Sequence, residues 1–349
     1  MKRVLLIGAG HGHLVVLRSL AQKPLYGARI TLVSPFSKQL YSGMLPGLLA
    51  GHYRRAEAQV DVAALAERAY VEFEQALVER LDVEKRAASL SNGRSLSYDF
   101  ASLNVGSLVD VSFPGAEHAL AVKPFDEFIA RLRIAERVAV AGAGASGAEL
   151  AMALRHRGAQ VTLYSAKPTM SPRLAARVLR QLRKRKVDFR PGMPVRAIEP
   201  GPVVIAGSSR QEFDLVLLAT GALPTPWLRR SGLALDERGF VLVHDTLQSV
   251  SHPEVFCIGD CATLRDSPHP KSGVYAVRHG EALVENLRRL FSGRALEPYL
   301  PQKRALLLLT CGARYAIAER GGWTAQGRWV WWWKDWVDRR WIKRLAAAR

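Results

Sequence analysis

RVAVAGAGASGAELAMALRHRGAQVTLYS, residues 137–165, is the stretch of this sequence that decides the fold. It consists of a short apolar run, a glycine-rich turn, a segment with helical spacing and a second run rich in β-branched residues. That order is typical of a strand, a turn, a helix and a parallel strand, which together form the βαβ unit of α/β proteins. We therefore expect a parallel sheet with helices packed on it.

The glycines of this unit follow the G-x-G-x-x-G pattern of dinucleotide-binding turns. Gly142 permits a tight turn, Gly144 lets the backbone approach a pyrophosphate, and Gly147 lets the helix pack closely on the strand. The helix N-terminus then offers free N–H groups and a partial positive charge to phosphates. NAD sites usually carry an acid at the end of the second strand, but residues 164–167 read Tyr-Ser-Ala-Lys. The choice between NADH and NADPH therefore stays open.

An earlier stretch, IGAGHGHLVV at residues 7–16, follows the same pattern with one departure. Gly8 and Gly10 stand at the first two glycine positions, but His13 stands at the third. The third glycine normally allows a helix to pack tightly on its strand, so the histidine occupies a crowded place.

Two further features of this first unit are altered. Gly12 is displaced by one position, and the second strand ends at Ser34 without the usual acid. We predict a working cofactor site of a variant type. Either His11 or His13 hydrogen-bonds a phosphate or the ribose in place of the missing carboxylate, or His13 packs under the helix.

The two units belong to an internal duplication. They lie about 130 residues apart, and each precedes a β-meander and a strand that ends in Gly106-Ser107 or Gly221-Ala222. We therefore predict an α/β protein with two Rossmann-like domains and a small C-terminal element.

Composition limits the class of protein and its partners. The 349 residues carry a formal net charge of +19, which favours an anionic partner such as a nucleotide, a nucleic acid or an anionic membrane. No nucleic-acid-binding motif accompanies the basic runs. The three cysteines are too few for a disulfide scaffold, fit a reducing compartment and lack the spacing of a zinc site. We expect a cytoplasmic protein without a metal or a transmembrane helix.

Four pieces converge on a known family. The two glycine turns, LLATGA at 217–222 and VFCIGDCA at 255–262 together resemble flavoproteins with two dinucleotide-binding domains, of the glutathione-reductase-like fold. Within that superfamily, residues 30–53 and YDFASLNVGS at 98–107 are similar to type II NADH:quinone oxidoreductases.

A still closer resemblance is to the flavoprotein domain found fused ahead of selenide, water dikinase. The segments that carry it are SPFSKQLYSGMLPGLLAGHY (34–53), VKPFDEF (122–128), LDERGFVLVHDTLQSVSHPEVF (235–256) and KSGVYAVRHG (271–280).

The resemblance implies FAD in a first domain, residues 1–115 and 245–310, and NAD(P)H in a second domain, residues 116–244. Residues 311–349 form the C-terminal element. The residues that it assigns to FAD are Gly8, Gly10, His11, Gly12, His13, Ser34, Pro35, Val78, Gly106, Gly259, Asp260, Gly273 and Val274. Those assigned to NAD(P)H are Gly142, Gly144, Ser146, Gly147, Ser165 and Gly221.

Particular roles also follow from the resemblance. Asp260 would bond the ribityl chain or pyrophosphate edge of FAD, and a helix capped by Ser272 would point its N-terminus at the flavin. Glu149 would lie beside the nicotinamide, unless it is only a first-turn acid favoured by the helix dipole. Lys123 would lie near flavin N5, unless it is exposed to solvent. Glu149 and Lys123 are the candidate catalytic residues.

Departures from related families shape the expected reaction. The loop QLYSGMLPG at 39–47 lacks the cysteine pair of disulfide reductases, and no cysteine precedes Cys257. Cys311 is either a reactive thiol or a packed one. Where quinone enzymes carry A-Q-x-A-x-Q, this chain has GVYAVRHG at 273–280. Tyr275, Arg278 and His279 therefore either line a different acceptor pocket or form a basic surface helix.

We predict an FAD-dependent NAD(P)H oxidoreductase that passes electrons to a quinone-like acceptor. The alternatives are a flavoprotein that oxidises a sulfur or selenium species, and a slow redox-sensing or electron-relay protein. The oligomeric state stays open, a homodimer included.

The basic tail holds six of the eight tryptophans, between residues 329 and 341. As a helix, it would gather Trp332, Trp333, Trp336 and Val337 on one face. Such a helix suits the interface of an anionic membrane, where each basic residue contributes about 1 kcal/mol. The basic residues in question are Lys334, Arg339, Arg340, Lys343 and Arg344. The alternatives are core packing of the aromatic side chains and a final strand over 329–333. The membrane interpretation would place the protein on the inner face of the membrane.

Overall fold

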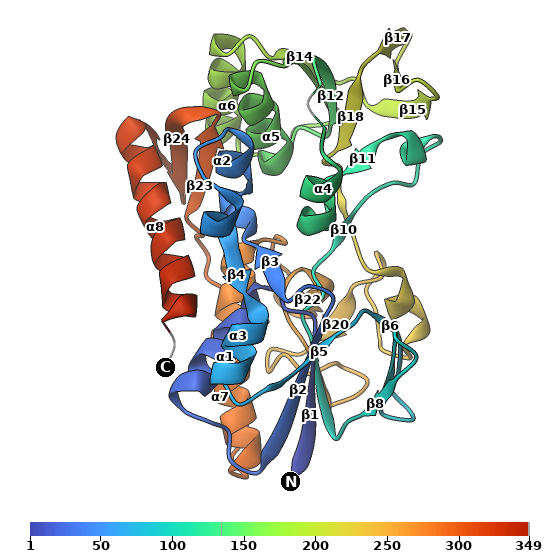
Figure 1. The fold of residues 1–349 in the computed structure, drawn as a ribbon, viewed down its shortest axis with the longest axis vertical. Coiled ribbons are helices and arrows are strands. Elements are labelled where there is room, and N and C mark those ends of the chain that lie inside the picture. The colour runs from blue at the N-terminus through green and yellow to red at the C-terminus, as the bar shows by residue number, and fades with distance from the viewer. Residues whose placement is uncertain (134, 348–349) are drawn as a thin grey trace.

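The fold is taken from a computed structural model, which describes residues 1–133 and 135–347. Figure 1 shows two sheet-containing regions one above the other, with the C-terminal helix along one side of both. The predicted α/β class with two Rossmann-like domains is confirmed.

The first domain is built on a parallel sheet in the order β21-β9-β1-β2-β5. These strands are β1 (Lys2–Ile7), β2 (Ala28–Ser34), β5 (Glu72–Gln75), β9 (Phe100–Leu103) and β21 (Val255–Cys257). The helices of this region are α1 (His11–Gln22), α2 (Leu45–Leu49), α3 (Val62–Arg68) and α7 (Gly273–Phe291). Because β1 is buried between β2 and β9, the turn that follows it lies at the carboxyl edge in the middle of the sheet, where α/β proteins place their ligands.

Smaller antiparallel pieces surround this sheet. They are the pair β3 (Lys38–Leu40) and β4 (Gln59–Asp61), and the meander β6 (Val78–Asp82), β7 (Ala87–Leu90) and β8 (Ser95–Ser97).

The second domain repeats the plan with the sheet order β11-β18-β12-β13-β14. Its strands are β11 (Leu120–Ala121), β12 (Arg137–Ala141), β13 (Gln160–Ser165), β14 (Asp188–Pro191) and β18 (Leu215–Leu218). Its helices are α4 (Phe125–Arg131), α5 (Ala145–His156) and α6 (Pro172–Lys184). Its meander is β15 (Val195–Glu199), β16 (Val203–Ala206) and β17 (Ser209–Glu212). The short pair β10 (Leu108–Val109) and β19 (Ala222–Leu223) connects the two domains.

The chain returns to the first domain earlier than the expected boundary at residue 245. Leu228, Leu233 and Val241 belong to the hydrophobic core of the first domain, as do β20 (Val241–Val243) and β22 (Ala262–Leu264). The shift arises because the short β10–β19 pair already ends the second domain, and the apolar side chains that follow it pack on the first core.

The C-terminal element begins at residue 307. It comprises the antiparallel strands β23 (Leu307–Cys311), β24 (Ala313–Arg320) and β25 (Trp323–Gly327), followed by α8 (Arg328–Ala346). The alternative of a strand over residues 329–333 is wrong, because α8 begins at Arg328. The element packs against residues 40–58 of the first domain. Within the described residues, no helix has the length and apolar character needed to cross a membrane.

Candidate functional site

The second glycine turn has the geometry that its sequence predicts. Gly142 adopts a positive φ of 106°, and a Cβ at Gly147 would lie 1.8 Å from the carbonyl oxygen of Gly142. A Cβ at Gly144 would meet nothing closer than Thr169 Oγ1 at 3.6 Å. The helix therefore packs on the turn through Gly147, while Gly144 leaves space above the turn for a ligand.

The side chain at the end of β13, where the ribose is predicted to bind, is an uncharged polar serine. Ser165 is buried at the end of β13 and donates a hydrogen bond to the Lys167 carbonyl at 3.3 Å. Ser146 and Gly221 are both exposed beside the turn. These residues lie at one edge of the second sheet, as expected for a nucleotide site.

The first glycine turn is built around a residue that the motif does not mention, Asn104. A Cβ at Gly8 would lie 2.7 Å from the Asn104 carbonyl oxygen, and one at Gly10 would lie 2.5 Å from Asn104 Oδ1. Asn104 Oδ1 accepts a hydrogen bond from the His13 backbone N–H at 3.0 Å, and Asn104 Nδ2 donates to the Ile258 carbonyl at 2.9 Å. Asn104 thus joins the start of α1 to the segment that carries Asp260.

His13 packs under the helix and does not face a ligand. It is fully buried, with Nδ1 2.6 Å from the Gly8 carbonyl oxygen and Nε2 2.8 Å from Ser102 Oγ. Burial lowers the pKa of His13 to about 4, so the ring is neutral at pH 7. Of the two alternatives for His13, a structural role is the one that the geometry supports.

Gly12 serves a helix–helix contact. A Cβ at Gly280 of α7 would lie 2.3 Å from the Gly12 carbonyl oxygen, and a Cβ at Gly12 would lie 2.9 Å from the Ala276 carbonyl oxygen. The displaced glycine therefore lets α1 approach α7, and His13 fills the space over the strand.

His11 is the histidine that faces the candidate cofactor site. Its Nε2 lies 3.3 Å from Ser42 Oγ, its ring is 5.4 Å from that of Tyr41, and it lies 3.7 Å from the position of a Cβ on Gly273. Burial lowers the pKa of His11, while the nearby Asp260 carboxylate opposes this shift. The start of α1 and the start of α7 thus converge at His11.

Helices α1, α5 and α7, which begin beside the candidate cofactor sites, are among the helices whose N-termini lack a side-chain cap. The residues before α1, α5 and α7 are Gly10, Gly144 and Ser272, and none of them accepts a capping hydrogen bond through a side chain. Ser272 occupies the predicted N-cap position but does not cap the helix. Free N–H groups at such ends suit phosphates and anionic ligands.

Asp260 and Lys123 form an ion pair. Lys123 Nζ lies 3.3 Å from Asp260 Oδ2 and donates to Ser107 Oγ at 2.9 Å, and Ser107 Oγ donates to Asp260 Oδ2 at 3.2 Å. The alternative of a solvent-exposed Lys123 is wrong, since only 26% of its side chain is accessible. Lys123 therefore orients the carboxylate that is predicted to bind FAD.

Other predicted FAD residues lie around the same sheet edge. Ser34 is buried at the end of β2 and Pro35 follows it, while Val78 is buried where β6 begins. Gly106 has positive φ, and no atom lies within 4 Å of the position of a Cβ there. Val274 is 40% exposed in the first turn of α7.

Glu149 is held in the space between the second domain and the C-terminal element. Its Oε1 accepts hydrogen bonds from the Thr310 backbone N–H at 2.7 Å and from Thr310 Oγ1 at 3.0 Å. Burial raises the pKa of Glu149 to about 7, although the Lys334 ammonium and the Thr310 hydrogen bonds oppose the rise. The alternative of a first-turn acid is wrong, because α5 begins at Ala145 and its first turn holds no acidic residue. A carboxyl with a pKa near 7 can exchange a proton at neutral pH.

The polar side of α8 faces inward, toward Glu149. Lys334 Nζ donates to the Gly43 carbonyl at 2.7 Å and to Asp338 Oδ2 at 2.6 Å, and Asp338 Oδ1 accepts from the Tyr41 hydroxyl at 3.3 Å. Lys334 and Asp338 are both buried. The prediction of Lys334 as a membrane-facing cation is wrong, because its charge is paired inside the molecule. Helical spacing alone gave no signal for this inward orientation.

The three residues predicted to line an acceptor pocket do not converge. His279 is buried, accepts from the Gly259 N–H at 3.0 Å and lies 3.0 Å from His269 Nε2. Tyr275 is buried and stacks on His269 at 4.1 Å. Arg278 is exposed and pairs with Glu281 at 2.9 Å. His279 therefore supports the Gly259 turn, and Arg278 lies on the surface.

All three cysteines are buried. Cys311 lies in β23, and burial raises the pKa of its thiol to about 12, which agrees with packing and not with reactivity. Cys257 and Cys261 lie in the core of the first domain with 3.4 Å between their sulfur atoms.

The pyridine nucleotide-disulphide oxidoreductase family matches residues 2–280. The chain belongs to this family. Its cofactors are FAD and NAD(P)H, and the uncapped N-termini of α1 and α5, at the glycine turns of the two sheets, fit their phosphates.

Relatives and a solved structure agree with this assignment. The NADH dehydrogenase-like protein YutJ of Bacillus subtilis is 25% identical over 323 residues, which covers 86% of this chain and 87% of YutJ. Ferroptosis suppressor protein 1 of Xenopus laevis is 24% identical over 260 residues, 68% of each chain. The sulfide:quinone oxidoreductase of Aquifex aeolicus has a similar fold, with a TM-score of 0.82 at 17% identity, and the match covers 100% of this chain and 92% of that one.

Proposed function

We propose that the chain is an FAD-dependent NAD(P)H oxidoreductase that reduces a quinone-like acceptor. The observation that carries the proposal is Glu149, a largely buried carboxyl with a pKa of about 7, two residues beyond the last glycine of the NAD(P)H turn. The NADH dehydrogenase-like name of the YutJ relative and the resemblance to type II NADH:quinone oxidoreductases support the same reaction.

The stoichiometry of the reaction explains why such a carboxyl is needed. NAD(P)H and a quinone yield NAD(P)⁺ and a quinol only if one proton is added from solvent. Bound FAD supplies a carrier that accepts two electrons from the nicotinamide and donates them to the acceptor. Glu149 can hold the additional proton at neutral pH. The charged side chains of Lys334 and Asp338 are buried and influence its pKa from within the protein.

The glycine turns position the two cofactors. Gly142, Gly144 and Gly147 would bind the NAD(P)H pyrophosphate, and Gly8 and Gly10 would bind that of FAD. His11 would donate to or accept from FAD, and Asp260, oriented by Lys123, would offer a carboxylate to the ribityl chain. These residues would bind and orient the cofactors and would not carry electrons themselves.

The rival substrates are sulfur or selenium species. The resemblance to the flavoprotein domain fused to selenide, water dikinase is the reason to test sulfide and selenide as electron donors. The burial of all three cysteines disfavours this alternative, because buried thiols are poorly reactive. A slow redox-sensing protein is the third alternative.

One experiment separates these functions. The purified holoprotein is mixed anaerobically with NADH, NADPH, sulfide or selenide, and the flavin absorbance is followed by stopped flow. We expect reduction by NADH or NADPH, followed by rapid reoxidation with a soluble short-chain quinone. Reduction by sulfide or selenide alone would overturn the proposal, and slow reduction by every donor would favour the sensor.

We also propose a peripheral location on the cytoplasmic face of a membrane. Trp329, Trp332 and Trp336 of α8 are 56%, 49% and 55% exposed, with Arg340 and Lys343 beside them. Exposed tryptophans flanked by basic residues are typical of membrane interfaces. The full chain with Trp329→Ala, Trp332→Ala and Trp336→Ala should lose binding to anionic liposomes, and unchanged binding would exclude the exposed tryptophans as the attachment.

A further inference from the structure

A hollow of about 630 Å³ lies between the second domain and the C-terminal element, away from both glycine turns. It is formed by the C-terminal ends of α5 and α6, by β24 and by the start of α8. Its lining residues are Arg155, His156, Lys184, Arg185, Ala313, Arg314, Tyr315 and Arg328. Because α5 has 12 residues, its end lies about 18 Å from the NAD(P)H turn at its start.

The hollow gathers positive charge that the protein does not neutralise. Five of its eight lining residues are Lys or Arg, and none is acidic. Among the ion pairs of the described residues, none involves these five side chains. Like charges held around one opening repel one another, and an anion in the opening would relieve that repulsion.

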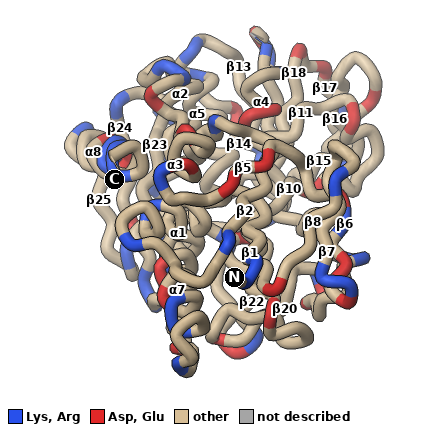
Figure 2. Tube along the Cα trace, turned by 60° about the horizontal axis from the view of Figure 1, so that its bottom comes forward, with Lys and Arg blue, Asp and Glu red and all other residues tan. Residues whose placement is uncertain are grey.

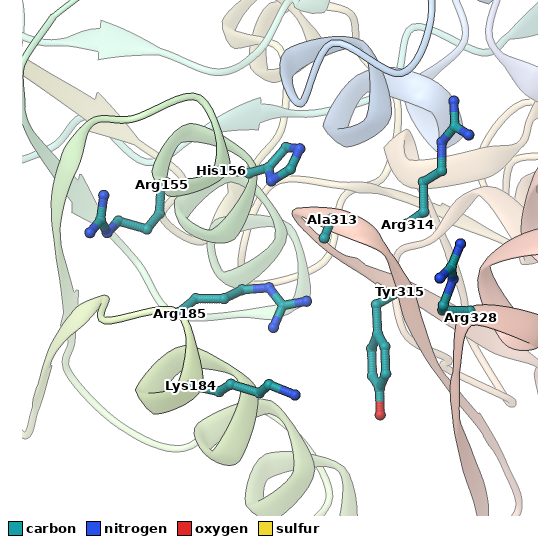
Figure 3. Close-up of a pocket in the computed structure, with 8 residues that line it drawn as sticks. All are labelled: Arg155, His156, Lys184, Arg185, Ala313, Arg314, Tyr315 and Arg328. Carbon is teal, nitrogen blue, oxygen red and sulfur yellow. The ribbon is translucent and has the colours of Figure 1, made fainter.

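The side chains are arranged for contact with an anion. Lys184 and Arg185 extend from the end of α6 toward Tyr315, with Arg328 beyond it (Figure 3). Arg185 is held in place, since its Nη1 donates to Gln181 Oε1 at 2.8 Å and its Nε donates to the Cys311 carbonyl. A fixed guanidinium next to flexible, exposed cations is suited to phosphate oxygens.

Arg314, which lines the hollow, also contacts indoles at the start of α8. The Arg314 guanidinium lies 5.5 Å and 5.8 Å from the ring centroids of Trp331 and Trp332. Trp332 also lines a second hollow, of about 720 Å³, together with Arg340, Lys343 and Arg344. Figure 2 shows basic positions at the end of α8 near the C-terminus. The basic lining of the hollow therefore adjoins the exposed Trp332 through Arg314.

We propose that the hollow at Lys184, Arg185 and Arg328 binds the phosphate of an anionic lipid headgroup while the α8 tryptophans enter the membrane interface. A lipid fits better than a free phosphate, because the exposed indoles beside the hollow need an apolar partner. This inference rests on the proposed peripheral attachment, and it brings the second domain into contact with the membrane.

The test removes two exposed cations from the hollow. The holoprotein with Lys184→Gln and Arg328→Gln is compared with wild type for binding to vesicles of phosphatidylglycerol and phosphatidylcholine in equal parts. Each basic residue near an anionic surface is worth about 1 kcal/mol, so we expect binding to weaken roughly 25-fold. Flavin content and Tm verify the fold, and NAD(P)H oxidation with a soluble quinone should not change.

The matched control removes the same charge elsewhere. Arg229 and Arg230 are exposed at the end of a 3-10 helix (Pro226–Arg230) that contacts β6. The meander of β6 and helix α8 lie on opposite sides of the molecule in Figure 1. Arg229→Gln with Arg230→Gln should weaken vesicle binding less than threefold. An equal loss in both variants would show diffuse charge attraction and overturn the proposal, as would unchanged binding of the hollow variant.

Two further experiments distinguish failure of the headgroup proposal from failure of the membrane proposal or of the catalytic proposal. Titration with inorganic pyrophosphate, followed by calorimetry, reports a free-anion site. Binding of pyrophosphate that depends on Lys184 and Arg328, without any vesicle binding, would overturn the lipid assignment. Loss of vesicle binding in Trp332→Ala with Trp336→Ala, but not in the hollow variant, would confirm attachment and refute the headgroup site. Wild type that does not bind vesicles but still reduces quinone would refute both membrane proposals and leave the catalytic one standing.

Discussion

The two glycine turns of this chain connect a strand to a helix in the same way, but different contacts hold the two helices in place. In the second turn, Gly147 lies against the Gly142 carbonyl, so the start of the helix packs directly on the backbone of the turn. In the first turn, the buried His13 ring bonds to Gly8 and Ser102, and Asn104 binds the His13 N–H. The N-termini of both helices remain uncapped by side chains.

The difference shows that the third glycine of the pattern can be replaced when other residues hold the helix. The first unit lacks the close helix–strand contact of a third glycine, and the hydrogen bonds of His13 and Asn104 hold its helix instead. Gly12 lets α1 pack against α7. A second difference lies two residues beyond the third position, where the first unit has the buried Val15 and the second has Glu149. Under the proposed function, the first turn would only bind its cofactor, and the second would also place a proton-exchanging carboxyl beside its cofactor.

Gly147→Ala should have the largest effect, because the new Cβ would lie 1.8 Å from a backbone oxygen. We expect a loss of about 3 kcal/mol in the free energy of unfolding, measured with urea. Gly144→Ala is the matched control, since its Cβ has space in the protein. It should keep the stability and raise the KM for NAD(P)H about tenfold, because the Cβ intrudes where the pyrophosphate approaches. Equal stability of the two variants would contradict the packing role of Gly147.

His13→Ala should destabilise the first domain by about 2.5 kcal/mol, because it leaves a cavity and removes two buried hydrogen bonds. His11→Ala is the contrasting variant, because His11 faces the cofactor site. It should leave the Tm of the apoprotein within about 1 °C and weaken FAD retention about fivefold. Gel filtration of the holoprotein with absorbance at the flavin band measures retention. If His13→Ala lowers retention without lowering the Tm, the histidine binds cofactor directly.

The buried imidazole also predicts a pH dependence. The pKa of His13 falls from 6.5 to about 4 on folding, so below pH 6.5 the unfolded chain binds more protons. The stability that the neutral His13 contributes to the folded state is complete above pH 6.5 and is lost as the pH falls toward 4. About 2 kcal/mol of unfolding free energy is lost by pH 5. His279, with a pKa of about 3, acts in the same direction. His13→Gln should reduce the slope of unfolding free energy against pH between 6 and 4.5 by up to one proton, and an unchanged slope would contradict the assignment.

Local patterns predicted both βαβ units and the edge of each sheet at which its glycine turn lies. They did so because the strand period, the glycines and the helical spacing are all encoded by neighbouring residues. Asn104 and Ser102 were not predicted as supports of the first turn, because each lies about 90 residues from His13 and acts through a contact that the sheet order creates. The replacement of the usual Ala-Thr by Asn104-Val105 was the available signal.

The C-terminal helix shows a different limit. Its spacing separates aromatic from charged positions, but spacing cannot say which side faces the protein. The structure buries Lys334 and Asp338 and exposes Trp332 and Trp336, because Tyr41 and the Gly43 carbonyl offer partners for the charges. A buried ion pair needs such partners, and they come from a loop almost 300 residues earlier in the chain.

Glu149→Gln tests the difference between Glu149 of the second unit and Val15 of the first. It should have the smallest effect, about 1.4 kcal/mol in the activation free energy of turnover. The amide keeps the shape and can still accept from Thr310 but cannot exchange a proton, so turnover with a soluble quinone should fall about tenfold at pH 7. The wild-type rate should change near pH 7, where Glu149 titrates, and the variant should lack that change. Reduction of the flavin by NAD(P)H in single-turnover mixing should be nearly normal, because the hydride step needs no proton from Glu149. If reduction and reoxidation slow equally, Glu149 orients the nicotinamide. The contrast with the valine of the first turn would then be one of packing and not of proton transfer.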